Sequence, residues 1–144
     1  MPRILFALLL LCATTAFAGE EIWSAMVLAS NPAAGKQPTP PPAELAAYTD
    51  RLKGKLGYEQ FEILGSASKA IGRGEQEKWL VPSPTFMLGA HARREGAGYR
   101  ISLELYQEKR RLLQTDARLG IQSPLFICGP KHARGQLIIM FEIR

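Results

Sequence analysis

The chain has 144 residues and a formal net charge of +5, from 18 Lys and Arg against 13 Asp and Glu. This length fits one domain whose core needs no disulfide or metal to stabilise it. The modest positive charge favours contact with anionic surfaces such as lipid headgroups or acidic glycans, and it is too small to indicate nucleic acid binding.

The first 18 residues predict a secretory signal peptide. Arg3 supplies the positive start, residues 4–11 are an unbroken apolar run, and Ala16-Phe17-Ala18 is a small-x-small cleavage site. The run is shorter than the roughly 20 apolar residues that a membrane-spanning helix needs. We therefore expect an exported protein, periplasmic or secreted, with no transmembrane segment after cleavage. The mature chain, residues 19–144, would be one small α+β domain with a net charge of +4.

The first half of the mature chain predicts a strand, a connector and a helix. Residues 22–29 are apolar on both faces, which indicates a strand covered on both sides or central in a sheet. Residues 31–42 contain five prolines and predict an exposed connector. Residues 42–56 predict an amphipathic helix, because Leu45, Tyr48, Leu52 and Leu56 share one face and Gly57 can end it.

The second half is rich in strand patterns. Alternation is clearest over residues 99–105, with one apolar and one polar face. Further strands are expected at 58–64, 77–81, 85–93, 125–128 and 136–143, with a loop at 129–135. Residues 107–119 fit a hairpin with a bend at Glu108-Lys109 better than a helix, because Lys109 and Asp116 would interrupt the helical stripe of leucines.

These elements predict an α+β fold with a mostly antiparallel sheet of about six strands and the helix on one face. Connections after residue 57 are too short for crossovers, which favours antiparallel pairing. The first strand is expected to pair parallel to the second, with the helix as the crossover.

No catalytic, cofactor-binding or metal-binding residues are expected. The sequence has no Cys-x-x-Cys or His-Glu-x-x-His motif, and its two histidines, His91 and His132, are far apart with no acidic cluster. Gly72-Arg73-Gly74 is too brief for a phosphate loop. The Ser66-x-x-Lys69 match to penicillin-recognising enzymes falls on strand and turn, and its partner motifs are missing.

Cys128 is the one cysteine outside the signal segment. Its apolar neighbours predict a buried side chain in a strand. The alternative is thiol chemistry, because His132 follows four residues later across Gly129-Pro130-Lys131 and a nearby histidine would lower the pKa of the thiol.

Basic residues gather at the expected bends. If the bends meet at one end of the sheet, they would contact an anionic partner, and otherwise they are ordinary solvated turns. The candidate contacts are Arg93, Arg94, Lys109, Arg110, Arg111, Lys131 and Arg134.

The chain resembles a group of short, exported, uncharacterised bacterial proteins with no assigned activity. The resemblance covers most of the mature chain, and it implies no catalytic residue. The phrases that carry it are Leu56-Gly57-Tyr58 with Phe61, Trp79-Leu80 with Pro82-Ser83 and Phe86, residues 123–127 with Gly129-Pro130, and Gly135-Gln136-Leu137.

The sequence therefore predicts a non-catalytic binding module of the bacterial cell envelope, which contacts another envelope protein or an anionic surface. One alternative is an inhibitor or sensor of an envelope enzyme that presents a rigid proline loop, at residues 123–130 or 81–84. A second alternative is a small thiol-dependent enzyme that uses Cys128 and His132.

Overall fold

A computed structural model describes residues 20–72 and 76–144, so the expected signal peptide and the centre of the turn at 72–74 lie outside the described residues. Within them, no helix is long and apolar enough to span a bilayer. The elements in chain order are β1 (Glu20–Ser30), the 3₁₀ turn η1 (Ala43–Leu45), α1 (Thr49–Leu56), β2 (Gln60–Ile71), β3 (Gln76–Pro82), β4 (Met87–Glu95), β5 (Gly98–Gln107), β6 (Arg110–Leu119), β7 (Leu125–His132) and β8 (Gly135–Ile143).

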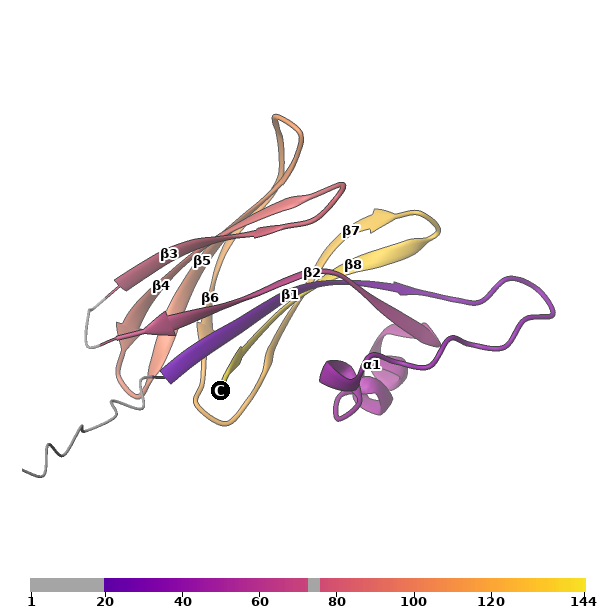
Figure 1. Cartoon of the computed structure of the whole chain (residues 1–144), viewed down its shortest axis with the longest axis horizontal. Helices are drawn as coiled ribbons and strands as arrows, with labels where there is room; N and C mark the ends of the chain where they lie inside the picture. The colour runs from indigo at the N-terminus through magenta and orange to yellow at the C-terminus, as the bar shows by residue number, and fades with distance from the viewer. Residues whose placement is uncertain (1–19, 73–75) are drawn as a thin grey trace, which may run out of the picture.

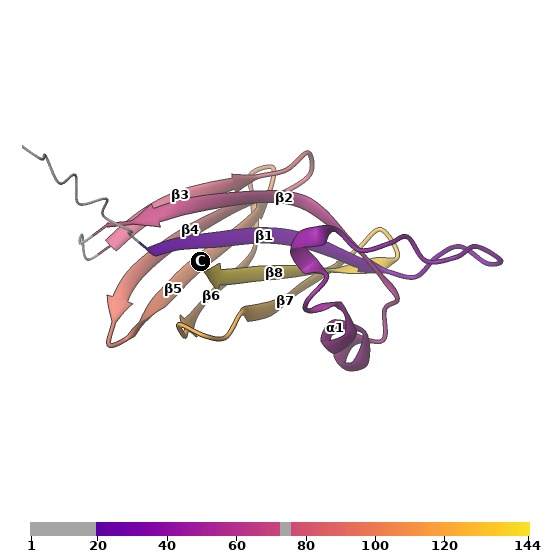
Figure 2. The same ribbon diagram turned by 60° about the horizontal axis from the view of Figure 1, so that its bottom comes forward.

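The strands form two four-stranded sheets, which we call sheet A (order β2-β1-β8-β7) and sheet B (order β3-β4-β5-β6). Figures 1 and 2 show the two sheets, with α1 beside sheet A. The prediction of a mostly antiparallel, sheet-rich fold with one helix is confirmed, but the expected six strands are eight and they divide between two sheets.

The expected parallel pairing of the first two strands is wrong, because β1 and β2 are antiparallel. An eight-residue helix is only about 12 Å long, whereas an eleven-residue strand is about 36 Å long. The helix is therefore too short to return the chain to the start of β1, and the next strand runs back alongside it.

The helical segment is shorter than the predicted 42–56. It divides into η1, held by i→i+3 bonds such as the Leu45 N–H to the Pro42 carbonyl at 3.0 Å, and α1. The Thr49 hydroxyl donates to the Leu45 carbonyl at 2.8 Å between them. Gly57 ends α1 in the left-handed conformation, with φ 75°, as expected.

β1 is central in sheet A and covered on both faces, as its sequence predicts. Ile22 and Met26 face the core between the sheets. Trp23 and Val27 belong to a second cluster under the helical segment, together with Leu52. A strand buried on both faces loses the polar alternation that marks a surface strand.

The predicted hairpin at 107–119 is confirmed, with its bend at Glu108 (φ 55°). The expected loop at 129–135 is wrong in part, because strand pairing continues to His132 and resumes at Gly135. Pro130 is compatible with this strand because β7 is an edge strand and its register shifts between Cys128 and Lys131.

Candidate functional site

The two sheets differ in how their outer faces are covered. The outer face of sheet A packs against the helical segment through Leu45 and Leu52. In the described part of the chain, no helix packs on the outer face of sheet B. This face therefore presents the side chains of four neighbouring strands to solvent.

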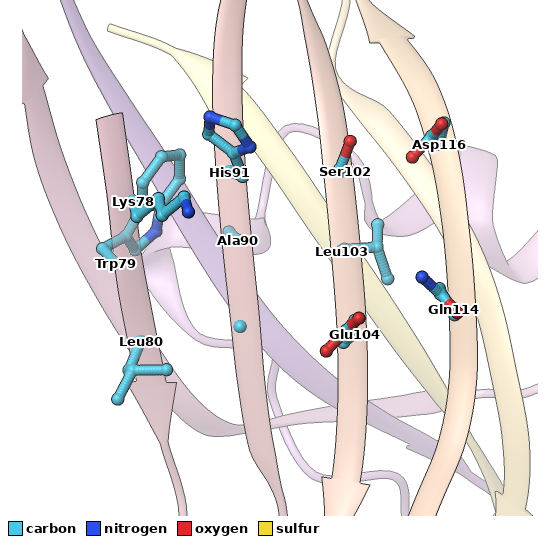
Figure 3. A pocket seen from close by; sticks show the side chains of 11 residues that line it. Lys78, Trp79, Leu80, Ala90, His91, Ser102, Leu103, Glu104, Gln114 and Asp116 are labelled. Atoms are coloured by element: carbon cyan, nitrogen blue, oxygen red, sulfur yellow. The ribbon is translucent and has the colours of Figure 1, made fainter. Parts of the chain in front are cut away.

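An open hollow of about 450 Å³ lies on that outer face. It forms where small residues, Gly89 and Ser102, sit between larger side chains. Figure 3 shows the hollow with Lys78 and Leu80 on β3 and Gln114 and Asp116 on β6 at its two sides. Leu80 is 62% exposed. The residues that line the hollow are Lys78, Trp79, Leu80, Gly89, Ala90, His91, Ser102, Leu103, Glu104, Gln114 and Asp116.

Strand register arranges the outward side chains of the hollow in two rows across the sheet. Strand pairs join Lys78 to His91, His91 to Ser102, and Ser102 to Asp116. The next row is Leu80, Gly89, Glu104 and Gln114. Each row mixes hydrogen-bond donors and acceptors, so the hollow can bind a ligand that carries many polar groups.

Local hydrogen bonds hold several of these side chains in place. The His91 ring Nε2 and the Gln76 amide oxygen are 2.9 Å apart. The Tyr106 hydroxyl donates to the Glu104 carboxylate at 2.6 Å, and this bond raises the pKa of Tyr106. Arg111 lies 3.8 Å from the same carboxylate. Glu104 therefore has two side-chain neighbours, Tyr106 and Arg111, at the edge of the hollow.

The hollow offers hydrogen bonding and charge. Among residues 20–72 and 76–144, no group of three His, Cys, Asp or Glu side chains could hold a metal ion. The Ser66-x-x-Lys69 match lies within strand β2, which is the strand context expected from the sequence.

A second hollow of about 200 Å³ lies beside the loop between β6 and β7, lined in part by Tyr48, Ser123 and Glu142. The Tyr48 hydroxyl donates to the Glu142 carboxylate at 2.5 Å, and this bond is the main reason that the pKa of Tyr48 is raised. The smaller hollow is less than half the volume of the larger one.

The predicted basic residues divide between the two ends of the molecule. Lys109, Arg110 and Arg111 form the β5–β6 hairpin, and Lys131 and Arg134 lie at the β7–β8 hairpin, both at the same end (Figure 1). Arg93 and Arg94 lie near the β4–β5 turn at the other end. The β5–β6 and β7–β8 hairpins belong to different sheets and form separate tips in Figure 1, and the contact of the basic bends with an anionic partner stays a prediction.

Arg93 and Arg94 lie on opposite faces of β4. Arg94 lies on the face of β4 that faces the core. Its Nη2 donates to the Tyr99 hydroxyl at 2.8 Å and lies 3.4 Å from the Glu20 carboxylate. Arg93 is exposed on the outer face of sheet B and pairs across strands with Arg100.

Cys128 lies in a strand, as expected, but its predicted burial is wrong, because the side chain is exposed. It pairs with Ile138, which belongs to the helix-side cluster. The His132 ring contacts the ring of Phe86, in the β3–β4 turn, at 4.8 Å between centroids, and Phe86 belongs to the core between the sheets. The two side chains therefore lie on opposite faces of β7, and the structure does not bring them together.

The two predicted proline loops are also compact. Most of residues 123–130 belong to strand β7. At the β3–β4 turn, the Phe86 N–H donates to the Ser83 hydroxyl oxygen at 2.9 Å, and Phe86 itself is buried. Pro82, Pro84 and Thr85 are nevertheless exposed at the end of the β3–β4 hairpin, so presentation of this turn to an envelope enzyme stays a prediction.

Sequence reasoning missed the residues of the hollow and the two arginines, Arg100 and Arg118, that flank it. The signal was present in the alternation of residues 99–105, where Arg100, Ser102 and Glu104 form the polar face. The residues of the hollow are far apart along the chain, and only strand pairing brings them together. No protein-family model, curated protein or solved structure matches this chain.

Proposed function

We propose that the protein is a non-catalytic, exported binding module and that the outer face of sheet B is its binding face. The observation that carries this proposal is the open hollow of about 450 Å³ on a face that no described helix covers. Its volume falls within the roughly 300–1,000 Å³ that is usual for small-molecule sites.

The chemistry of the hollow supports binding more than catalysis. Lys78, Ser102 and Gln114 supply hydrogen-bond donors, and Glu104 and Asp116 supply acceptors. Catalysis would need a nucleophile or proton donor that a second side chain activates. In the hollow, His91 lies opposite Ser102, but its Nε2 is engaged with the Gln76 amide oxygen at 2.9 Å. In the described residues, Cys128 and His132, which the sequence suggests as such a pair, lie on opposite faces of β7.

A titration followed by amide NMR shifts would test this proposal. The probes are galactotriose, trigalacturonate and the dipeptide alanyl-glutamine, each added to the purified protein. We expect at least one probe to shift the amide signals of Lys78, His91, Ser102 and Glu104 and to be recovered chemically unchanged.

A hollow-filling variant gives the control. Gly89→Trp would place an indole in the hollow, and the added Cβ would meet only ordinary contacts, at 3.8 Å from Leu80 Cδ2 and 3.9 Å from the Glu104 carbonyl oxygen. It should abolish the shifts and keep the fold. Gly54→Trp, on α1 where a Cβ meets nothing within 4 Å, should leave them unchanged. Shifts that centre elsewhere, shifts that survive Gly89→Trp, or no shifts with any probe would overturn the proposal.

A further inference from the structure

Three arginines form a row beside the hollow, on the same outer face of sheet B. The strand register places Arg93 opposite Arg100 and Arg100 opposite Arg118, on β4, β5 and β6. All three are exposed. Neighbouring strands are about 4.8 Å apart, so the row spans roughly 10 Å. We call these three residues the arginine row.

The arginine row carries more positive charge than its surroundings neutralise. Like charges directly opposite each other on a sheet are destabilising. Glu95 accepts from Arg100, at 3.1 Å from Nε and 3.3 Å from Nη2. Over residues 20–72 and 76–144, neither Arg93 nor Arg118 makes an ion pair. A bound anion would therefore remove a repulsion that the free protein retains.

Guanidinium groups in such a row suit a planar anion. A guanidinium presents N–H donors in a fork that matches the two oxygens of a carboxylate. Arg100 already donates from Nε and Nη2 to Glu95, so Arg93 and Arg118 are the members of the row that can receive a carboxylate of a ligand. Arg118 Nη2 lies near Gly96, 3.4 Å from the position that a Cβ there would take, so its guanidinium extends over the β4–β5 turn. The backbone of the arginine row is two residues, or about 7 Å, along the strands from that of His91 and Ser102, so the ligand has to be longer than one sugar to reach both rows.

The acidic residues of the hollow decide which anionic ligand fits. An anionic membrane or a polyphosphate would bring negative charge against Glu104 and Asp116, which the hollow exposes beside Lys78. A saccharide would instead donate hydroxyl protons to those carboxylates and accept from Lys78 and Ser102. Charge complementarity therefore favours a ligand that is acidic at the arginine row and neutral and hydroxyl-rich at the hollow.

We infer that the binding face recognises an oligosaccharide that carries carboxylate groups. One carboxylate binds across the arginine row, and the hydroxyl groups of a neighbouring sugar occupy the hollow. This inference rests on the proposed function, because it names the ligand class of the same face.

Isothermal titration calorimetry with two matched probes tests the inference. Trigalacturonate carries carboxylates, and galactotriose is its neutral counterpart. At about 50 mM salt we expect trigalacturonate to bind at least tenfold more tightly. The advantage should shrink as salt rises, because exposed charges are screened.

Two double variants separate the arginine row from net charge. Arg93→Gln with Arg118→Gln should remove the preference for trigalacturonate, and should not lower the melting temperature, because it relieves like-charge repulsion. Arg51→Gln with Lys53→Gln, on exposed positions of α1, removes the same charge from the far side of the molecule and should keep the preference.

Each contrary outcome has its own meaning. Equal binding of the two sugars that Gly89→Trp abolishes would refute the inference and keep the proposed function. No binding of either sugar, or equal weakening by both double variants, would also refute the inference. If vesicles containing phosphatidylglycerol bind through Arg93 and Arg118 and trigalacturonate does not, the row recognises a lipid surface and the inference is wrong.

Discussion

Tyr99 is a fully buried polar side chain whose hydroxyl lies between two charged groups. It donates to the Glu20 carboxylate and accepts from Arg94 Nη2 at 2.8 Å, and the Arg94 guanidinium lies 5.0 Å from the centre of its ring. Burial first, and then the hydrogen bond to Glu20, raise the pKa of Tyr99 to about 12. This group links the start of β1 to sheet B.

The raised pKa predicts a loss of stability at alkaline pH. Unfolded tyrosine titrates near pH 10, so between about pH 10 and 12 the unfolded chain releases a proton that the folded protein keeps. The stabilisation is complete below pH 10 and is lost as pH rises toward 12. In Tyr99→Phe the free energy of unfolding should fall less steeply over pH 9–12, measured by urea unfolding. Identical slopes in both proteins would contradict the assignment.

Ser24 makes the second polar link between the sheets. It is fully buried on β1, donates to the Ala67 carbonyl at 3.1 Å, and accepts from the Trp79 indole N–H at 2.9 Å. Ser24→Ala would leave that indole N–H without its partner, which costs roughly 1–2 kcal/mol.

Urea unfolding should detect this loss. A Trp79→Phe background has no indole N–H to orphan, so Ser24→Ala should cost less there than in the wild-type protein. Equal costs in the two backgrounds would show that the hydrogen bond contributes nothing.

At the scale of elements, glycine decides how closely β2 and β3 approach where the sheets meet. A Cβ on Gly65 would collide with the carbonyl oxygen of Pro82, a backbone atom that cannot rotate away. Gly65→Ala should therefore lower the free energy of unfolding by about 1–3 kcal/mol. Gly54→Ala, in α1 with open space around it, should raise that free energy by up to about 1 kcal/mol. Thermal unfolding of both variants tests the pair, and a stable Gly65→Ala would contradict it.

Elements whose side-chain pattern is set locally could be predicted from sequence. The alternation of Tyr99, Ile101, Leu103 and Leu105 places all four in the core, and the polar bend at Glu108 marks the hairpin. The strand at Pro130 was missed because proline normally ends a strand, and only edge position and irregular register make it acceptable.

Features that depend on which strands meet could not be predicted from local patterns. The division into two sheets depends on which strands pair with which, and the arginine row depends on the register of those pairs. The sequence indicates Arg93 as a candidate contact because it neighbours Arg94. Arg100 and Arg118 lie beside Arg93 only because of the strand register.

At the scale of the whole molecule, two hydrophobic clusters share β1 and β8. Trp23 lies in the helix-side cluster, and Trp79 packs against the cluster between the sheets, 6.5 Å from the Phe141 ring. The shared strands should make the two clusters unfold together.

Single-tryptophan variants test this cooperativity. Trp23→Phe and Trp79→Phe each leave one fluorescent reporter, and in each variant the fluorescence transition in urea should coincide with the far-ultraviolet circular dichroism transition of the same protein. Separate transitions in either variant would show that one cluster unfolds alone.

The exposed connector after β1 should allow a protease to cut the chain without unfolding the protein. β1 is hydrogen-bonded on both sides, to β2 and β8, whereas residues 33–41 are exposed and project from the body of the molecule (Figure 1). A protease that cuts after Lys36 would break the chain, and the fragment that contains β1 would stay bound through its hydrogen bonds to β2 and β8. The cleaved protein should give two bands on a denaturing gel and one peak in gel filtration. A synthetic β1 peptide could then replace the native fragment and restore the folded complex.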